Sequence, residues 1–482
     1  MIDLRPVGYI IGLLVGVLGV TMLVPFGVDF AYGNPDAGNF ALSAMITVVA
    51  GSLMALATAN ASLNTLTIQQ TFLLTTLSWL VLPIFGALPF WLGEPNATYT
   101  DAFFEAMSGL TTTGSTVFTQ LHTLPEGTLL WRGLMQWFGG VGIIVVAMAF
   151  LPTLKVGGMQ IFRSEGFDTI GKVLPRAAEI ATSISIVYLV LTITCIASYG
   201  AVGMDLFDAT VHALTTVATG GFANYDDSFA GFSDATEYVA TTFMILASLP
   251  FIRYVQMLNG STKPLFKDSQ VWAFLGFWAF LVISMAAYRY FNASGDTAGT
   301  FRQTLFNVTS ILTGTGYASA DYGVWGAFPV MLFFLMGLVG GCAGSTCCSI
   351  KIFRFQLLVA AIRSQIQKIH SPNGVFTPRY QGRRVGEDIM SSVTGFFVAF
   401  MLTLATLAVI LGMLGLDAVT AITGAATALA NVGPGLGHQI GPTGNFAGLP
   451  DAAKWVLSAA MLIGRLELMA VYVLFSFAFW RH

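Results

Sequence analysis

The chain has 482 residues, of which 55% are hydrophobic and only 9% are charged, and its formal net charge is −3. Soluble proteins carry roughly 25% charged residues, so this composition excludes a soluble globular protein and indicates a multi-pass membrane protein. The sequence contains no basic cluster of the kind that binds nucleic acids, so we expect no nucleic-acid partner. Its four cysteines lie in or beside apolar segments, which indicates neither a disulfide framework nor a metal site.

Apolar runs near the length that crosses a bilayer, about 20 residues, occur ten times along the chain. The first run is too long for a signal-peptide core, so we expect it to be retained as a spanning helix. The first two spans predict a leading hairpin, and the other eight pair into four units. The expected spans are 6–28, 40–59, 72–92, 131–152, 180–202, 238–258, 270–291, 328–350, 390–413 and 453–478.

Positive charge is distributed unevenly between the connecting segments. With the N-terminus placed inside, fifteen lysines and arginines fall on inside segments and four on outside segments. The positive-inside rule therefore predicts that both termini are cytoplasmic. Sixteen acidic residues, Glu105 and Asp226 among them, thread outside, where we expect most to be solvated and their field to concentrate cations.

Each of the four units contains a short helical segment that is too brief to cross the membrane. Three of these segments begin near an aspartate, namely Asp101, Asp208 and Asp417, which favours a helix start. Each segment is followed by a loop of small residues around a glycine. These four loops are TTTGST with Gly114, VATGGF with Gly220, TGTGYA with Gly316, and ANVGPG with Gly433.

The chemistry expected of these loops is cation dehydration by backbone carbonyls. Glycine permits φ > 0, which can turn successive carbonyls toward one axis, and non-helical backbone is tolerated at membrane depth only where it lines a cavity. Four such loops around one axis would give rings of oxygens that replace the water around K⁺. The predicted filter residues are Thr112, Thr113, Gly114, Ala218, Thr219, Gly220, Gly314, Thr315, Gly316, Asn431, Val432 and Gly433. Of these, the expected K⁺ ligands are Thr112, Thr113, Ala218, Thr219, Gly314, Thr315, Asn431 and Val432.

A run of small residues interrupts the second spanning segment of the third unit. Glycine costs about 1 kcal/mol relative to alanine within a helix, so this run predicts an unwound loop over 337–350 that lies beneath the filter as a gate. A small-residue packing face between helices is the alternative interpretation. The predicted gate residues in this run are Gly337, Gly340, Gly341, Gly344 and Ser345.

Arg465 lies in the middle of the last predicted span. An arginine at the bilayer centre costs on the order of 2.5–3.5 kcal/mol on insertion scales. Glu467 is two residues away and points to a different side of a helix, so it cannot fully neutralise Arg465. We expect Arg465 to face the cavity and oppose cation passage, and a structural ion pair with another helix is the alternative.

Several of these motifs together resemble the TrkH-type subunits of the Trk/Ktr/HKT potassium transporters. The motifs are DAFFEAMSGLTTTGST, LTTVATGGFA, LVGGCAGST, LANVGPGLG and GRLE, and the resemblance covers essentially the full length. It implies an all-α polytopic membrane protein with four pseudo-symmetric membrane–pore–membrane repeats around one pore, plus the N-terminal two-helix hairpin. The expected divisions are 1–66 for the hairpin, 67–160 (filter loop 111–116), 161–266 (217–222), 267–385 (313–318) and 386–482 (431–436) for the repeats.

The resemblance also implies an activity and partners. It implies gated K⁺ uptake across the bacterial inner membrane, a homodimer, and a cytosolic nucleotide-binding regulatory subunit of the TrkA type, besides contact with membrane lipid. It assigns K⁺ selectivity to the glycine at position 114 and a pore-facing role to Arg465. The chain departs from the family's glycine-rich pattern after GGCAGST, where it has Cys347, Cys348 and Ser349.

Two other functions are weighed against K⁺ uptake. A Na⁺-permeable or Na⁺/H⁺-coupled transporter of the same fold is the nearer alternative. An intramembrane enzyme is the second, but the five histidines are scattered and neither HExxH nor GxSxG occurs. The chain has no phosphate-binding GxxxxGK[ST] segment and no dinucleotide fingerprint, so we expect no organic cofactor, and nucleotide control must come from another chain.

Overall fold

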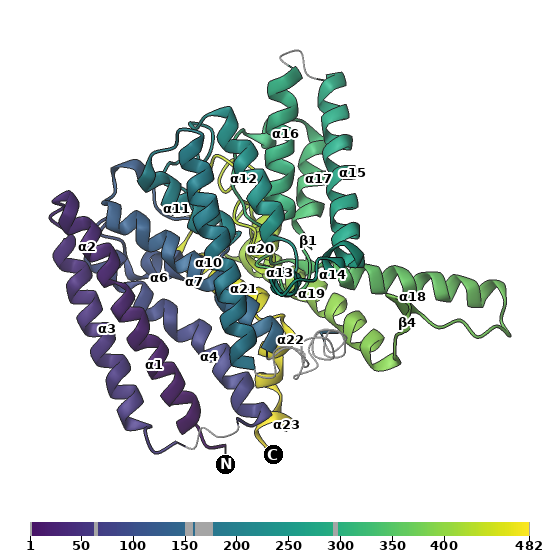
Figure 1. Cartoon of the computed structure of the whole chain (residues 1–482), viewed down its shortest axis with the longest axis horizontal. Coiled ribbons are helices and arrows are strands. Elements are labelled where there is room, and N and C mark those ends of the chain that lie inside the picture. The colour runs from purple at the N-terminus through teal and green to yellow at the C-terminus, as the bar shows by residue number, and fades with distance from the viewer. Residues whose placement is uncertain (1, 62–65, 150–157, 160–176, 293–296, 482) are drawn as a thin grey trace.

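The computed structural model describes residues 2–61, 66–149, 158–159, 177–292 and 297–481. These residues are mostly helical, and the two chain ends lie close together at the same end of the molecule (Figure 1). Four of the positive charges expected on the inside, Lys155, Arg163, Lys172 and Arg176, lie outside the described residues.

The leading hairpin forms as predicted. Helices α1 (Arg5–Thr21) and α2 (Leu23–Tyr32) together make one long span, and α3 (Ala37–Ala57) runs back beside α1. Small residues permit this close approach, because a Cβ at Gly12 would lie 2.6 Å from the backbone nitrogen of Ala55.

Four times along the rest of the chain, a long helix is followed by a short helix, an irregular loop and a second helix. The first set is α4 (Ile68–Gly86), α5 (Leu88–Leu92), α6 (Tyr99–Leu110), η1 (Leu121–Thr123) and α7 (Glu126–Ala149). The second is α10 (Ala177–Ala201), α11 (Leu206–Val217), α12 (Asp234–Ala247), α13 (Phe251–Leu258) and α14 (Lys263–Lys267). The third is α15 (Ser269–Asn292), α16 (Thr297–Leu312), η2 (Tyr322–Val324), α17 (Ala327–Gly337) and α18 (Ile352–His370). The fourth is α19 (Glu387–Met413), α20 (Ala418–Ala430), α21 (Asp451–Arg465), α22 (Met469–Tyr472), η3 (Val473–Phe475) and α23 (Phe477–Trp480).

The lengths of these helices correct the expectation of ten continuous spans. Among the described residues, seven helices are long and apolar enough to cross a membrane by themselves. Two further spans are broken, because α12 and α13 meet at a bend of 87° and α21 meets the segment Met469–Phe475 at 103°. The predicted span 328–350 is not one helix, since α17 ends at Gly337. The second halves of the last three units are therefore all interrupted.

Within the described ranges the strands are few and short. Strands β1 (Val339–Gly340) and β2 (Ile350–Lys351) pair in parallel and close the loop between α17 and α18. Strands β3 (Arg379–Tyr380) and β4 (Arg383–Arg384) form a small antiparallel hairpin beyond α18, and α18 projects sideways from the rest of the molecule (Figure 1). The loop between β1 and β2 lies in the predicted gate segment.

Candidate functional site: four converging loops above a buried loop

The four short helices α6, α11, α16 and α20 share one function in the fold, which is to deliver a loop to the same place. Side-chain oxygens cap three of them: Thr98 accepts from the Asp101 amide, Asp205 from Phe207, and Asp417 from Val419 and Thr420. The hydrogen bonds of Thr420 to the exposed Asp417 carboxylate lower its pKa, so this cap is ionised at neutral pH. Asp208, near which we expected the second short helix to begin, lies in its first turn, and Asp205 is the cap.

All four short helices end in the same way. In each, a backbone N–H reaches back five residues to a carbonyl of the last turn, from Thr113 to Ser108, Gly220 to Thr215, Thr315 to Ser310, and Val432 to Thr427. The residue before each of these donors is left-handed, which is the geometry of a Schellman-type helix end. These residues are Thr112 (φ 52°), Thr219 (φ 50°), Gly314 (φ 72°) and Asn431 (φ 53°).

This shared backbone pattern fixes how the loops correspond. A second left-handed residue follows two positions later in every loop, at Gly114 (φ 85°), Gly221 (φ 79°), Gly316 (φ 85°) and Gly433 (φ 112°). In loops one, three and four these are the predicted glycines. In loop two the pattern falls one residue later than expected, so Thr219, Gly220 and Gly221 take the places that the sequence assigned to Ala218, Thr219 and Gly220. The adjacent glycines of VATGGF made the two alignments indistinguishable from sequence alone.

The loops meet one another in a closed order. A Cβ at Gly114 would overlap the Gly220 carbonyl oxygen, one at Gly221 would overlap that of Thr315, and one at Gly316 would overlap that of Val432. The circle closes where a Cβ at Gly433 would lie 2.8 Å from the Thr113 carbonyl oxygen. Each glycine thus leaves room for a carbonyl of the next loop, and no larger residue fits these positions without movement of a neighbouring backbone.

One cavity joins the four loops. It has a volume of about 90 Å³, and its lining includes Gly114, Gly221, Gly316 and Gly433; we call it the vestibule. Asp226 also lines the vestibule, where its carboxylate accepts the amides of Gln120 and Leu121 at 2.7 and 3.0 Å. Burial raises the pKa of the lining Tyr225 to about 12, and a hydrogen bond to Asp208 acts in the same direction, so its phenol stays neutral.

A buried ion pair stands behind the first two loops. The Arg132 Nε lies 2.8 Å from a Glu105 carboxylate oxygen, and both side chains are almost fully buried. Arg132 also donates to the Ala223 carbonyl of loop two at 2.8 Å, while Glu105 accepts the Val117 amide of loop one at 2.9 Å. Glu105 is therefore an exception among the acidic residues, most of which were expected to be solvated, and Arg132 lies within α7, where its charge is paired and buried.

Polar side chains within the loops are joined as well. The hydroxyls of Thr111 and Thr113 lie 2.7 Å apart, and the Asn431 side-chain amide donates to Thr113 Oγ1 at 2.9 Å. The Ser115 hydroxyl donates to the Gly433 carbonyl at 2.8 Å, which ties loop one to loop four a second time.

The segment predicted to be a gate is an irregular, buried loop that touches the base of the four-loop site. We call residues 341–349 the intramembrane loop. Gly340 lies in β1, Gly344 is left-handed (φ 74°), and the Ser345 hydroxyl donates to the Cys342 carbonyl at 2.7 Å. The Ser349 amide donates to the carbonyl of Ala430, the last residue of α20, at 2.9 Å.

The bend between α12 and α13 receives this loop. The Cys342 amide donates to the Ser248 carbonyl at 3.0 Å, and the Phe251 amide donates to the Gly344 carbonyl at 2.9 Å. The amide of Ala343 finds a side-chain acceptor, Gln270 Oε1, at 2.9 Å. The loop's backbone is therefore anchored by an interrupted helix that the sequence reading treated as continuous.

Arg465 lies at the break after α21 and is 2% exposed. Its guanidinium donates to the Gly139 carbonyl at 2.9 Å, to the Thr346 carbonyl at 3.5 Å, and to the sulfur of Cys348. Within the described part of the chain, no carboxylate forms a salt bridge with Arg465, whereas Glu467 pairs with Arg354 of α18. A second small cavity of about 20 Å³, lined by Ser345, Cys348 and Arg465 among others, lies here and is called the inner pocket.

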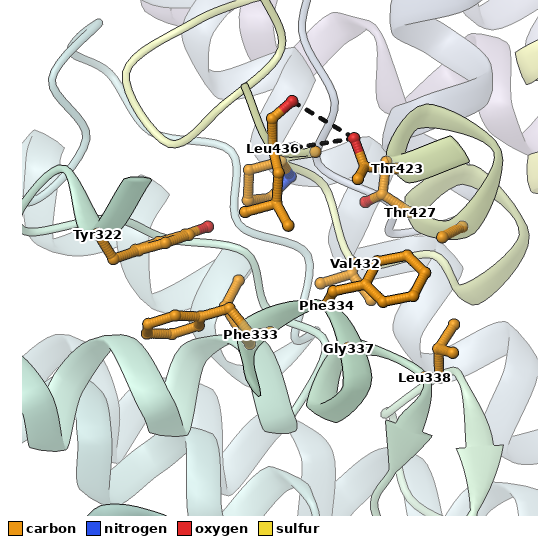
Figure 2. Close-up of a pocket in the computed structure, with 13 residues that line it drawn as sticks. Tyr322, Phe333, Phe334, Gly337, Leu338, Thr423, Thr427, Val432 and Leu436 are labelled. Carbon is orange, nitrogen blue, oxygen red and sulfur yellow. Dashed lines mark hydrogen bonds between the residues drawn. The ribbon is translucent and has the colours of Figure 1, made fainter. Parts of the chain in front are cut away.

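A third cavity separates α17 from loop four without belonging to either chamber. It measures about 30 Å³ and is mostly apolar, with Tyr322 and Phe333 on one side and Val432 and Leu338 on the other (Figure 2). The dashed lines in Figure 2 mark the hydrogen bonds of Thr423 with Leu436, which hold loop four against its own helix. This cavity is a packing gap behind the loop.

Taken together, these features define a class of protein: a multi-pass membrane protein in which four helix-capped loops meet around one cavity above a buried, arginine-braced loop. Comparison with known proteins then gives the family. The family model of TrkH, described as a cation transport protein, matches residues 37–480. The chain therefore belongs to the TrkH family.

Similar proteins cover the chain almost end to end. It is 44% identical to the Trk system potassium uptake protein TrkI of Halomonas elongata, over 99% of this chain and 97% of that protein. It is 35% identical to the Trk system potassium uptake protein TrkH of Escherichia coli K12, over 99% of both chains. The crystal structure of the potassium transporter TrkH from Vibrio parahaemolyticus matches with a TM-score of 0.92 and 32% identity over 100% of both chains. The predicted family and the predicted all-α membrane fold are confirmed.

Sequence reasoning missed three features of this site. It missed the polar side chains that stand behind the loops, of which Arg132 is one, because their partners come from distant segments. It also missed the bend at 248–250, although a Ser-Leu-Pro run there was a usable signal. The pairing of Glu467 with Arg354 left no signal, since 113 residues separate the two.

Proposed function

We propose that this chain takes up K⁺ across the bacterial inner membrane through a gated filter of backbone carbonyls. The observation that carries the proposal is the closed circle of contacts among Gly114, Gly221, Gly316 and Gly433 around one cavity. The full-length relatives are named as potassium uptake proteins, which supports the choice of ion.

The proposed filter works by replacing water with fixed dipoles. Carbonyl oxygens at the ends of four short helices carry partial negative charge, which favours a cation and offsets the loss of its hydration shell. The residues proposed to contribute are those predicted from sequence, with loop two shifted to Thr219, Gly220 and Gly221. The driving force would be the membrane potential, which is worth about 2.3 kcal/mol per charge per 100 mV.

The proposed gate is the intramembrane loop together with Arg465. The loop is buried beneath the first and fourth filter loops, where Thr112 Oγ1 lies 3.8 Å from Cys348 Sγ. Arg465 holds the loop through Thr346 and Cys348, and its charge opposes an approaching cation. Passage of an ion would require the loop and the guanidinium to move together.

The partners proposed are a second copy of the chain, surrounding membrane lipid and a cytosolic nucleotide-binding regulatory subunit. The words "Trk system" in the relatives' names support a multi-component assembly. Helix α18 is separated from the intramembrane loop only by β2 and projects from the molecule, so a subunit bound to it would have a short mechanical route to the gate. The excess of basic residues on inside segments supports cytoplasmic termini.

A Na⁺-permeable transporter of the same fold is the competing proposal. Both are tested by measuring K⁺ and Na⁺ flux into liposomes that contain the purified chain, under an imposed inside-negative potential, with and without its regulatory subunit. We expect K⁺ flux to exceed Na⁺ flux and to respond to the subunit and nucleotide. Equal K⁺ and Na⁺ flux would favour the competing proposal, and absence of any cation flux in both conditions would contradict both.

A further inference from the structure

Helix α7 presents a polar face to the second filter loop. Arg132 and Gln136 are four residues apart on this helix and so lie on the same side of it. The Gln136 side chain is fully buried. Its Nε2 donates to the Gly220 carbonyl oxygen at 2.6 Å, and its Oε1 accepts the Phe222 amide at 3.1 Å.

The orientation of this amide follows from its partners. A backbone N–H can only donate and a carbonyl can only accept. If the side-chain amide were reversed, its NH₂ group would face the Phe222 N–H and its oxygen would face the Gly220 carbonyl oxygen, and neither hydrogen bond could form. The single Gln136 amide therefore bridges the peptide groups on either side of Gly221, the glycine of loop two that faces the vestibule.

This contact makes loop two unlike its counterparts. Thr113, Thr315 and Val432 hold the positions that correspond to Gly220, and within the described residues no side chain donates to their carbonyls. The Gly220 carbonyl oxygen is also the one that faces Gly114 of loop one. A carbonyl has two lone pairs, so a hydrogen bond fixes its direction and leaves one lone pair for another partner.

We propose that Gln136 is a positioning residue for cation selectivity, and this inference rests on the proposed filter. Its amide holds the Gly220 carbonyl in a fixed direction. In the proposed ring of four corresponding carbonyls, those of Thr113, Thr315 and Val432 accept no side-chain donor among the described residues, whereas that of Gly220 is shared with Gln136. A ring whose members cannot move resists shrinking around a smaller ion, and loss of this restraint lets loop two adjust to Na⁺.

The substitution Gln136→Met tests this inference, because methionine keeps the length of the side chain and removes both hydrogen bonds. We expect the Na⁺/K⁺ flux ratio in liposomes to rise about three- to tenfold, the range that loss of the one hydrogen bond to the Gly220 carbonyl supplies. Gln136→Asn, which is too short to bridge both groups, is expected to change the ratio in the same direction and serves if the first variant does not fold.

The matched control is Gln70→Met. Gln70 is also buried, and its amide makes two bonds of the same kind, to the Asp3 carbonyl at 2.8 Å and from the Thr67 amide at 2.9 Å, in a different part of the molecule. We expect this control to lower the thermal unfolding temperature in detergent, as the Gln136 variants do, without changing the Na⁺/K⁺ flux ratio.

The outcomes separate this inference from the proposed function. An unchanged ratio in folded Gln136→Met and Gln136→Asn, alongside an altered ratio in Gly114→Ser, would overturn the role of Gln136 and leave the filter standing. Unchanged ratios in all three variants would overturn the filter itself. An equal change in Gln70→Met would show that the ratio reports only on stability, and the positioning role would fall.

Discussion

Replacement of Gly114 by serine is the sharpest test of the four-loop site. Gly114 is left-handed (φ 85°), and a Cβ on it would overlap the Gly220 carbonyl oxygen of the neighbouring loop. Two effects add in this variant: the backbone must hold a conformation that L-residues avoid, and the carbonyl must retreat. Because Gln136 fixes that carbonyl, its retreat disturbs loop two as well.

The magnitude follows from these two effects. A non-glycine residue in the left-handed region costs about 1–2 kcal/mol. If the loop relaxes by displacing the Gly220 carbonyl, a comparable free energy is lost from K⁺ coordination at this level, which corresponds to roughly a five- to thirtyfold change in relative affinity. We expect the Na⁺/K⁺ flux ratio of Gly114→Ser to rise by a factor of this order.

The control for this experiment is Gly203→Ser. Gly203 is left-handed as well (φ 91°) and lies just before α11, but no atom of the described residues lies within 4 Å of a Cβ placed on it. The two variants therefore share the backbone penalty and differ only in the contact with a filter loop. The assay measures K⁺ and Na⁺ flux into liposomes and the unfolding temperature in detergent for both variants.

A specific result would refute the reasoning. If Gly203→Ser altered the Na⁺/K⁺ flux ratio as much as Gly114→Ser, the effect would come from general destabilisation. If folded Gly114→Ser kept the ratio of the unsubstituted chain, the first loop would not form a wall of the filter, and the circle of contacts among the loops would have no bearing on ion choice.

Two further predictions concern the proposed gate. Arg465→Ala removes the donor to Gly139, Thr346 and Cys348 together with a buried positive charge, and we expect K⁺ flux in liposomes to rise severalfold; unchanged or lower flux in folded protein would make Arg465 structural. Deletion of Gly340 and Gly341 removes one of the paired residues of β1 and shortens the intramembrane loop, so we expect either unregulated flux or loss of the folded state, which thermal unfolding distinguishes. Normal flux that still responds to the regulatory subunit would contradict the gate assignment.

The general plan of this fold could be predicted from the sequence because hydropathy indicates the spanning helices and the glycines indicate the loops between them. Long apolar runs gave the spanning helices, and the short segments before Gly114, Gly316 and Gly433 gave three loops in the register that the structure has. Loop two was assigned one residue early, since Gly220 and Gly221 satisfy the same pattern locally. What decides between them is contact, because Gly221 faces Thr315 of loop three while Gly220 faces Gln136.

Buried polar groups were the second limit of sequence reasoning. Glu105 and Arg132 looked like solvated loop or helix-end residues, since neither has an opposite charge at helical spacing. In the structure each is the other's partner, and together they hold the backbones of loops one and two. A buried charge whose partner lies on another segment leaves no local pattern, so such pairs emerge only when the fold brings the segments together.

The breaks in the second helices show the same limit most clearly. The break between α17 and α18 was predictable because four glycines weaken the helix there. The break after α21 contains no glycine at its turning point: Glu467 (φ 62°) and Leu468 (φ 46°) both have a positive φ. Residues in such conformations cost of order 1–3 kcal/mol each and persist only where the surroundings fix them.

The surroundings of this break supply that restraint. Glu467 pairs with Arg354 of α18, and Leu468 is 1% exposed. The turn that places Arg465 against the intramembrane loop is thus held from the far end of the same loop, where α18 begins. The interrupted segments α17–α18 and α21–α22 stabilise each other's irregular backbone. For this reason neither the position of the break after α21 nor the direction of Arg465 could be derived from the neighbouring residues in the sequence.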